Sequence, residues 1–209
     1  PARNRFGGRI MFPIIDQAKR VIGFGGRIMA GDGPKYLNSP DSAVYHKGRV
    51  LFGIPQAAPG IKRAREAVVV EGYMDVIACH QAGAENTVAP LGTAFTEEQA
   101  LSLRRLCDQV VLVFDADRAG IAAAEKSGRI AESNGLKVQV VSLGGDRDPA
   151  DILHSEGAEA LVSALGERQE LFDMLMRQAV KEADISKSEG RELVLHKLFP
   201  YIKVVDSEV

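Results

Sequence analysis

Acidic side chains follow three apolar segments of this sequence, at the points where buried strands would end. Glu71 follows the first segment, Asp115 and Asp117 follow the second, and Asp148 and Asp151 follow the third. A carboxylate that leaves water costs several kcal/mol, roughly, unless a partner or a metal ion compensates its charge. We therefore expect a cation beside these carboxylates.

The chemistry of the acids indicates which cation this would be. The candidate ligands are carboxylates without a histidine or cysteine motif, which favours Mg²⁺ or Mn²⁺ over zinc. Asp75 lies four residues after Glu71, one turn into the following helix, and would point back at the same place. Asp115 and Asp117 would share one face at a spacing of about 7 Å if their strand stays extended.

Each acid also has a purely structural interpretation. Asp117 would pair with Arg118 or cap the next helix, and Asp151 would cap the short helix that follows it. Independent caps would not all be expected at the same ends of adjacent strands, whereas a shared metal site requires that placement. Glu71 is the hardest to explain in this way, because it closes a run of three valines and precedes Gly72.

The elements that would position these acids alternate along the chain. From residue 66 to about 143, apolar strands alternate with amphipathic helical patterns, which is typical of a doubly wound parallel sheet covered on both faces. Thr96, followed by Gln99, predicts a helix start, and Gly135 predicts a helix stop. The sequence therefore predicts an α/β fold (α+β overall), and ligands of such sheets bind outside the carboxyl ends of the strands.

The two flanking segments have different patterns. Residues 9–16 and 20–29 predict short strands of a hairpin-rich sheet, residues 31–42 predict a loop, and the chain from about Gly166 onward has a helical pattern only. We expect a basic β-rich subdomain at 1–65, the α/β unit at 66–153 and a helical subdomain at 154–209.

Charge is distributed unevenly along the chain. Residues 1–65 hold 12 lysines and arginines against 3 acidic residues, whereas residues 66–209 hold 14 against 25. A basic segment of this kind suits binding to phosphates, although a solvated basic surface would have the same composition.

Composition narrows the class of protein. The 45% hydrophobic and 26% charged residues are ordinary for a globular protein, and no apolar run approaches the roughly 20 residues that span a membrane. The N-terminal residues contain no apolar signal core, so we expect a cytoplasmic protein with no membrane partner. Cys79 and Cys107 lack zinc-binding spacing and predict reduced core thiols.

Several short motifs resemble those of the bacterial DnaG-type replicative primases. EGYMD at 71–75 and DADRAG at 115–120 look like the toprim metal centre, and RIMFPI, GFGGR, PKYLNSP and HKGR upstream resemble the catalytic core of that family. An acid followed by DxD is shared with topoisomerases and toprim nucleases, whereas EGYMD, KYLNSP and DADRAG in this order and spacing are specific to primases. The resemblance covers about residues 5–153. It implies a toprim-like doubly wound parallel sheet, preceded by the small basic β-rich subdomain and followed by C-terminal helices.

The resemblance also implies roles for individual residues. Glu71, Asp115 and Asp117 would be catalytic. The metal-binding set would be Glu71, Asp75, Asp115, Asp117, Asp148 and Asp151. This chain departs from the family at the last of these, because it has DPAD where family members often have DPD, which moves the second acid to Asp151. The residues that bind nucleotide or nucleic acid would be Arg5, Arg27, Lys35, Tyr36, Asn38, Ser39 and Lys47.

The implied activity is that of a primase, a DNA-directed RNA polymerase that makes short RNA primers with Mg²⁺ or Mn²⁺. Its expected partners are a single-stranded DNA template and ribonucleoside triphosphates, with the replicative helicase and single-strand-binding protein engaged through parts mostly outside this chain. The family's zinc-binding module and the start of its catalytic domain would precede Arg5, and a helicase-binding domain would follow. We therefore expect an excised core, monomeric and without structural zinc.

Two other classes of function remain open. A toprim nuclease or topoisomerase would use the same acids to cleave a phosphodiester, and a topoisomerase would also need a nucleophilic tyrosine. None of the four tyrosines lies in a sequence context that suggests this role: Tyr36, Tyr45, Tyr73 and Tyr201. A non-catalytic nucleic-acid-binding module would keep the fold alone, but clustered carboxylates without a metal would be destabilising. Tyr36 would either stack on a base or pack within its loop.

Overall fold

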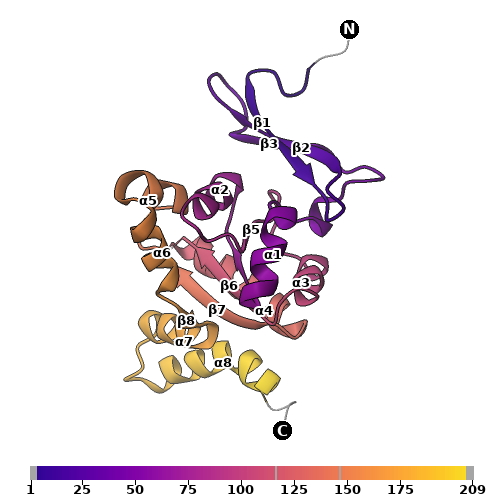
Figure 1. The fold of residues 1–209 in the computed structure, drawn as a ribbon. Helices are drawn as coiled ribbons and strands as arrows, with labels where there is room; N and C mark the ends of the chain where they lie inside the picture. Colours follow the sequence, from indigo (N-terminus) through magenta and orange to yellow (C-terminus); the bar gives the residue numbers. More distant parts are fainter. Residues whose placement is uncertain (1–3, 116, 146, 206–209) are drawn as a thin grey trace.

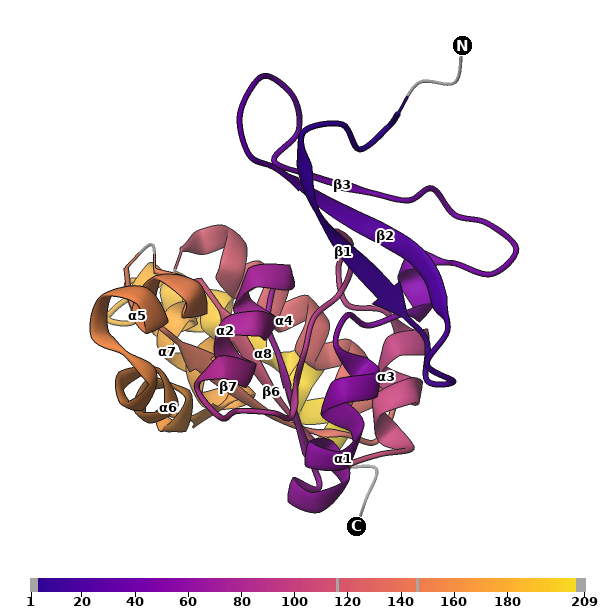
Figure 2. The same ribbon diagram turned by 45° about the horizontal axis from the view of Figure 1, so that its top comes forward.

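The computed structural model describes residues 4–115, 117–145 and 147–205 and contains two separate sheets. A three-stranded antiparallel sheet comes first in the chain, and a five-stranded sheet with helices on both faces follows it. Figures 1 and 2 agree that the three-stranded sheet forms a layer apart from the central sheet. Figure 1 places the last two helices at the opposite end of the molecule.

The first sheet is built around a hairpin. Strands β1 (Arg9–Ile15) and β2 (Val21–Ile28) pair antiparallel, and β3 (Tyr36–Asn38) pairs with β2. The Asp16 carboxylate closes the turn by accepting hydrogen bonds from the backbone N–H and the side chain of Arg20, at 2.9 and 2.8 Å. This confirms the paired strands predicted at 9–16 and 20–29, whereas the loop predicted at 31–42 is wrong at β3, where main-chain pairing with β2 forms a three-residue strand.

The central sheet has the order β5-β4-β6-β7-β8. Its strands are β4 (Glu66–Val69), β5 (Thr87–Val88), β6 (Gln109–Phe114), β7 (Lys137–Ser142) and β8 (Gln169–Glu170). The first four are parallel, and β8 pairs antiparallel with β7 at the edge. The prediction of helical structure only after Gly166 is wrong at β8, because a two-residue strand is formed by main-chain pairing and leaves no side-chain pattern.

Helices cover both faces of this sheet. They are η1 (Lys47–Arg49), α1 (Ile54–Ala64), α2 (Tyr73–Gln81), α3 (Glu97–Arg104), α4 (Arg118–Ser133), α5 (Pro149–Glu156), α6 (Ala158–Gly166), α7 (Leu171–Glu182) and α8 (Ser188–Val205). Val111 and Val113 pack with α2, α5 and α6, whereas Val110, Leu112 and Phe114 pack with α1, α3, α4, α7 and α8. The alternation along β6 confirms the predicted doubly wound sheet.

The predicted helix boundaries and core thiols are also found. Thr96 caps α3 in a reciprocal pair of hydrogen bonds with Gln99, and Gly135 follows the end of α4 with a φ of 76°. Cys79 and Cys107 are both buried, and burial raises the pKa of the Cys79 thiol to about 12 and that of Cys107 to about 11. No helix in the described part of the chain is long and apolar enough to cross a membrane.

The proposed boundaries of the three subdomains stay predictions. The helix α1 belongs to the predicted first subdomain, but it buries Ile54, Ala57 and Ile61 in the core of the central sheet. A further apolar cluster, which includes Phe12, Ile14 and Tyr73, joins the first sheet to α2. The two sheets are therefore packed onto a shared set of side chains.

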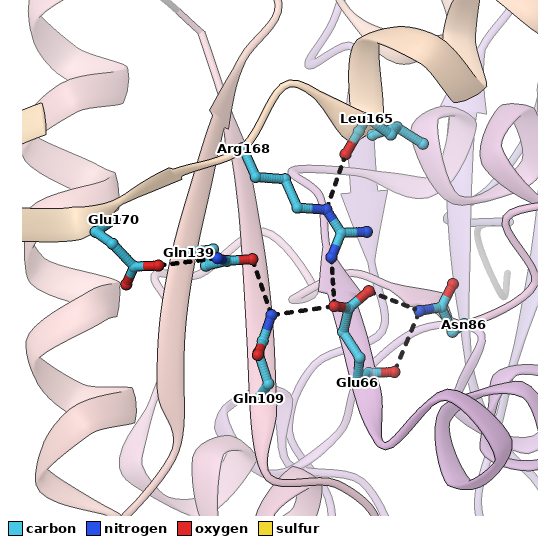
Figure 3. A network of polar contacts seen from close by, with 7 residues as sticks. All are labelled: Glu66, Asn86, Gln109, Gln139, Leu165, Arg168 and Glu170. Carbon is cyan, nitrogen blue, oxygen red and sulfur yellow. Dashed lines mark hydrogen bonds and ion pairs between the residues drawn. The ribbon is translucent and has the colours of Figure 1, made fainter.

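A network of polar side chains ties the strands together near their amino ends (Figure 3). The amide of Gln109 on β6 donates to Glu66 on β4 at 3.1 Å and to Gln139 on β7 at 2.9 Å, and Gln139 donates to Glu170 on β8 at 2.9 Å. Arg168 forms an ion pair with Glu66 and donates to the Leu165 carbonyl at 3.2 Å. This network holds the strands in register, and the register decides which residues meet at the opposite, carboxyl ends.

The Arg168→Met variant should lower the free energy of unfolding by about 1–2 kcal/mol, because the Glu66 carboxylate, only 14% exposed, loses its charged partner. Urea denaturation measures the change. The matched control is Arg63→Met, which breaks an ion pair with Glu85 whose side chains are 72% and 62% exposed and should cost at most about 0.5 kcal/mol. Equal losses in the two variants would contradict a structural role for the network.

Candidate active site

The acids predicted from the sequence lie at the carboxyl ends of three neighbouring strands. Glu71 follows β4, Asp115 follows β6 directly, and Asp148 begins α5 after β7. Asp75 lies in the first turn of α2, where its carboxylate accepts a hydrogen bond from the Gly72 N–H at 2.9 Å. The parallel register therefore brings these acids to one edge of the sheet, as predicted.

A cavity of about 480 Å³ opens at this edge. One wall comes from the first sheet, a second from the segment between β4 and α2, and the third from α5 and the segment before it. The predicted site residues that line it are Arg27, Lys35, Tyr36, Asn38, Glu71, Asp75, Asp115, Asp148 and Asp151. Cations and carboxylates thus face the same space from different elements.

Four predicted residues do not line this cavity. Asp117 lines a neighbouring cavity of about 450 Å³, which Glu71 and Asp115 also border. Arg5 lies in an exposed turn before β1. The Ser39 hydroxyl accepts a hydrogen bond from the Phe24 N–H at 3.0 Å. Lys47 belongs to η1. The binding roles assigned to Arg5, Ser39 and Lys47 stay predictions.

Burial and mutual repulsion raise the pKa values of two acids. Asp75 is 7% exposed, and burial, followed by the charge of Asp148, raises its pKa to about 7. The Glu71 side chain reaches solvent, yet partial desolvation and the charge of Asp115 still raise its pKa. Smaller contributions from Asp117 and Asp148 act on Glu71 in the same direction. The carboxylates lie close enough to repel one another.

Besides Asp75, which accepts from the N-cap residue of α2, three of the acids cap helices or support caps. Asp117 caps α4 by accepting from the Gly120 N–H at 2.6 Å, and Asp148 caps α5 by accepting from the Asp151 N–H at 2.7 Å. Asp151 accepts a long hydrogen bond of 3.5 Å from the Asp148 N–H, so it supports the cap instead of forming it. The extended geometry considered for Asp115 and Asp117 does not occur, because β6 ends at Phe114 and Asp117 already begins a helix.

The carboxylate groups are suitable ligands for a hard divalent cation, but they do not converge on one point. Their ligand atoms are carboxylate oxygens, which Mg²⁺ and Mn²⁺ prefer. Within residues 4–115, 117–145 and 147–205, no three acidic, histidine or cysteine side chains converge closely enough to hold a metal ion. An ion bound here would therefore have to draw Glu71, Asp115 and Asp148 together, and in doing so would relieve their repulsion.

The two cationic side chains that line the cavity with the acids, Arg27 and Lys35, both lie near one aromatic ring. The Arg27 guanidinium lies 5.8 Å from the centre of the Tyr36 ring, and the Lys35 ammonium lies 6.0 Å from it. Tyr36 itself stacks on Tyr73, with 5.8 Å between ring centres. The ring of Tyr36 thus packs against α2 and not within its own loop, and its stacking on a base stays a prediction.

Some residues that line the cavity were not singled out from the sequence. His154 lies in the last turn of α5, two turns beyond Asp148, and its position could have been found only from the spacing of a helix that starts at Asp148. Gly92 adopts a φ of 68°, and a Cβ there would lie 3.2 Å from the Asn38 amide nitrogen. Tyr73 also lines the cavity, between Glu71 and Asp75.

Comparisons with known proteins fit this arrangement. Residues 2–58 match the N-terminal domain of the DNA primase catalytic core, and residues 68–153 match the Toprim-like family. The DNA primase of Deinococcus radiodurans is 39% identical over 204 residues, which cover 97% of this chain and 36% of that protein. The chain therefore spans about a third of the length of the curated relatives it matches.

Solved structures show the same similarity. The RNA polymerase domain of Mycobacterium tuberculosis primase DnaG has a TM-score of 0.86 and 35% identity, covering 97% of this chain and 67% of that one. A DnaG primase catalytic domain bound to single-stranded DNA has a TM-score of 0.85 and 37% identity, covering 96% of this chain and 66% of that one. At these identities the similarity extends beyond the fold to the family.

The raised pKa of Asp75 predicts a pH-dependent effect of the Asp75→Asn variant. The folded protein holds this proton up to about pH 7, whereas the unfolded chain releases it near pH 4, roughly. The stability of the parent should therefore fall as pH rises from about 4 to about 7. In the presence of a chelator, Asp75→Asn should be more stable than the parent by about 1–3 kcal/mol at pH 8 and nearly equal to it at pH 4.5.

Urea denaturation at the two pH values checks this expectation. Asp32→Asn, a change in an exposed loop, is the matched control and should show no such difference. An Asp75→Asn variant that is equally destabilised at both values would contradict the assignment of a buried, proton-holding carboxyl.

Proposed function

This chain belongs to the bacterial DNA primases of the DnaG type, and from that premise we propose that it performs metal-dependent synthesis of RNA primers on single-stranded DNA. The observation that carries the proposal is the placement of Arg27 and Lys35 opposite Glu71, Asp115 and Asp148 in one cavity. Carboxylates alone would repel a triphosphate, and cations alone would bind it without activating a nucleophile. Together they meet both needs of nucleotidyl transfer.

In the reaction, a 3′-hydroxyl attacks the α-phosphorus of a ribonucleoside triphosphate, and pyrophosphate leaves. Arg27 and Lys35 would bind the triphosphate oxygens, which places the α-phosphorus toward the acids. Glu71 would lie nearest the reacting atoms. Mg²⁺ or Mn²⁺ bound by the acids would lower the pKa of the attacking hydroxyl and neutralise charge on the triphosphate.

The remaining acids would support this centre. Asp115 and Asp148 would bind metal with Glu71, because all three border the cavity and follow neighbouring strands. Asp117 and Asp148 each use one carboxylate oxygen as a helix cap, which fixes the side chain and leaves the other oxygen for a ligand. Asp75 accepts a hydrogen bond from the Gly72 N–H and so fixes the backbone next to Glu71.

The template would lie along the basic first segment. Residues 1–65 carry the excess of lysine and arginine, and a relative of known structure binds single-stranded DNA. Arg5 and Lys47, which lie outside the cavity, would contact template phosphates, whose neutralisation releases counterions. As in the family, the replicative helicase and the single-strand-binding protein would act through other parts, in the cytoplasm.

Phosphodiester cleavage is the second candidate function, since the same acids would serve it. A topoisomerase also requires an available tyrosine hydroxyl. The Tyr73 hydroxyl donates a hydrogen bond to Asn38 at 2.6 Å, and Tyr45 is fully buried. The Tyr201 hydroxyl, on α8, is hydrogen-bonded to Arg129 and Glu125 on α4. Tyr36 packs against Tyr73. The burial of Tyr45 and the hydrogen bonds of Tyr73 and Tyr201 argue against tyrosine-dependent cleavage by these three residues.

The Glu71→Gln variant should lose primer synthesis by about 100-fold or more, because a neutral amide cannot replace the charge that organises the reaction centre. Incorporation of labelled ribonucleotides on single-stranded DNA with Mg²⁺ or Mn²⁺ measures this, in the natural protein that carries these 209 residues. The control variant is Glu159→Gln, on the exposed surface of α6, which should retain full synthesis.

Two results would contradict the proposal. One is undiminished synthesis by Glu71→Gln. The other is nicking of DNA by the unsubstituted protein without any RNA product, which would establish the cleavage reaction in place of synthesis.

A further inference from the structure

Two side chains form a hydrogen-bonded bridge between the first sheet and the loops that carry the acids. The Tyr73 hydroxyl donates to the Asn38 side-chain oxygen at 2.6 Å, and the Asn38 side-chain nitrogen donates to the Leu91 carbonyl at 3.0 Å. The bridge thus joins β3, the start of α2 and the loop after β5.

Aromatic packing holds the Tyr73 ring in place beneath the bridge. Tyr73 is 4% exposed, stacks on Phe12 with 5.0 Å between ring centres, and meets the edge of Phe52 at 4.6 Å. Its hydroxyl reaches Asn38 only because β2 has a glycine at position 25, where a Cβ would collide with the Tyr73 hydroxyl. The close approach of β2 to Tyr73 is therefore built into the sheet.

The same ring supports the cations on one side and adjoins the acids on the other. Arg27 and Lys35 lie over Tyr36, Tyr36 stacks on Tyr73, and Tyr73 is two residues from both Glu71 and Asp75. Among the residues that the structure describes, the first sheet has no strand in common with the central sheet. The separation between cations and acids must therefore be fixed by side-chain contacts of this kind.

We propose that Tyr73 and Asn38 are positioning residues for nucleotidyl transfer: their bridge sets the separation between the triphosphate-binding cations and the acids. The inference rests on the proposed function. It gives Asn38 a positioning role through its hydrogen bonds to Tyr73 and Leu91, whereas the nucleotide-binding role expected for Asn38 stays a prediction. Neither residue takes part in bond making or breaking.

This role predicts a specific kinetic effect. Arg27 and Lys35 stay together on β2 and beside β3 when the bridge is broken, so binding of the triphosphate should change little. The α-phosphorus would then be held less accurately against the acids, which lowers the rate of the chemical step. Loss of a direct contact with the nucleotide would instead raise KM and leave kcat nearly unchanged.

The test compares Tyr73→Phe, Asn38→Ala and the double variant in templated RNA synthesis by the natural protein that carries this chain. Each single variant should lower kcat about tenfold with KM for the nucleotide within about twofold, and the double variant should be no slower than Asn38→Ala. Tyr73→Phe keeps the ring stacked on Phe12 and Tyr36, so it isolates the loss of the hydrogen bond.

The matched control is Tyr201→Phe. The Tyr201 hydroxyl also takes part in two hydrogen bonds, with Arg129 at 2.6 Å and Glu125 at 2.8 Å, but it lies between α4 and α8, away from the cavity. This variant should lower the melting temperature and leave kcat unchanged. A loss of kcat in Tyr201→Phe equal to that in Tyr73→Phe would overturn the proposal, as would a raised KM with unchanged kcat.

Hydrogen exchange separates a failure of this inference from a failure of the proposed function. If the unsubstituted protein makes no RNA, the primase proposal fails, and the bridge is judged from the backbone amides of β3. Faster exchange there in Tyr73→Phe than in Tyr201→Phe would support the bridge as the link that holds the first sheet. Equal exchange in the two variants would overturn it.

Discussion

Electrostatic repulsion among carboxylates at one edge of the central sheet is the constraint to which the rest of the structure responds. Parallel strands in register bring Glu71, Asp115 and Asp148 to the same place, and burial of Asp75 behind them raises the cost. The polar network around Glu66 and Gln109 fixes that register from the opposite ends of the strands. The carboxylates of the folded protein therefore repel one another at the cavity. A bound cation would relieve this repulsion, and the relief would favour binding of the cation.

The first sheet supplies the complementary charge, and its packing decides how that charge is used. Arg27 and Lys35 are held on Tyr36, and Tyr36 rests on Tyr73 within the segment that carries two of the acids. An aromatic cluster is suited to this task because it excludes water and permits only a small range of ring separations. Substrate binding and metal binding are thus assigned to different sheets that share one set of packed rings.

Much of this arrangement could be predicted from the sequence, because the signals were periodic. The alternation of Val110–Phe114 gives a buried strand, and an acid that follows such a strand must lie at the carboxyl edge of a parallel sheet. Features set by tertiary contacts could not be predicted. The cap that Asp117 forms on α4 was one of the structural interpretations offered by the sequence, but the sequence did not decide between this cap and an extended strand end, and the two-residue β8 has no pattern of its own. The place of His154 at the cavity could be seen only once Asp148 was found to cap α5, and Lys47, in η1, does not line the cavity.

The claim that the acids form a divalent-cation site is tested most directly by anomalous diffraction at the manganese edge from crystals grown with Mn²⁺. The account predicts an anomalous peak at the cavity edge, within coordinating distance of carboxylate oxygens of Glu71, Asp115 and Asp148, with these side chains drawn closer together than in the metal-free protein. Absence of a peak there at saturating Mn²⁺, with the carboxylates still apart, would contradict it.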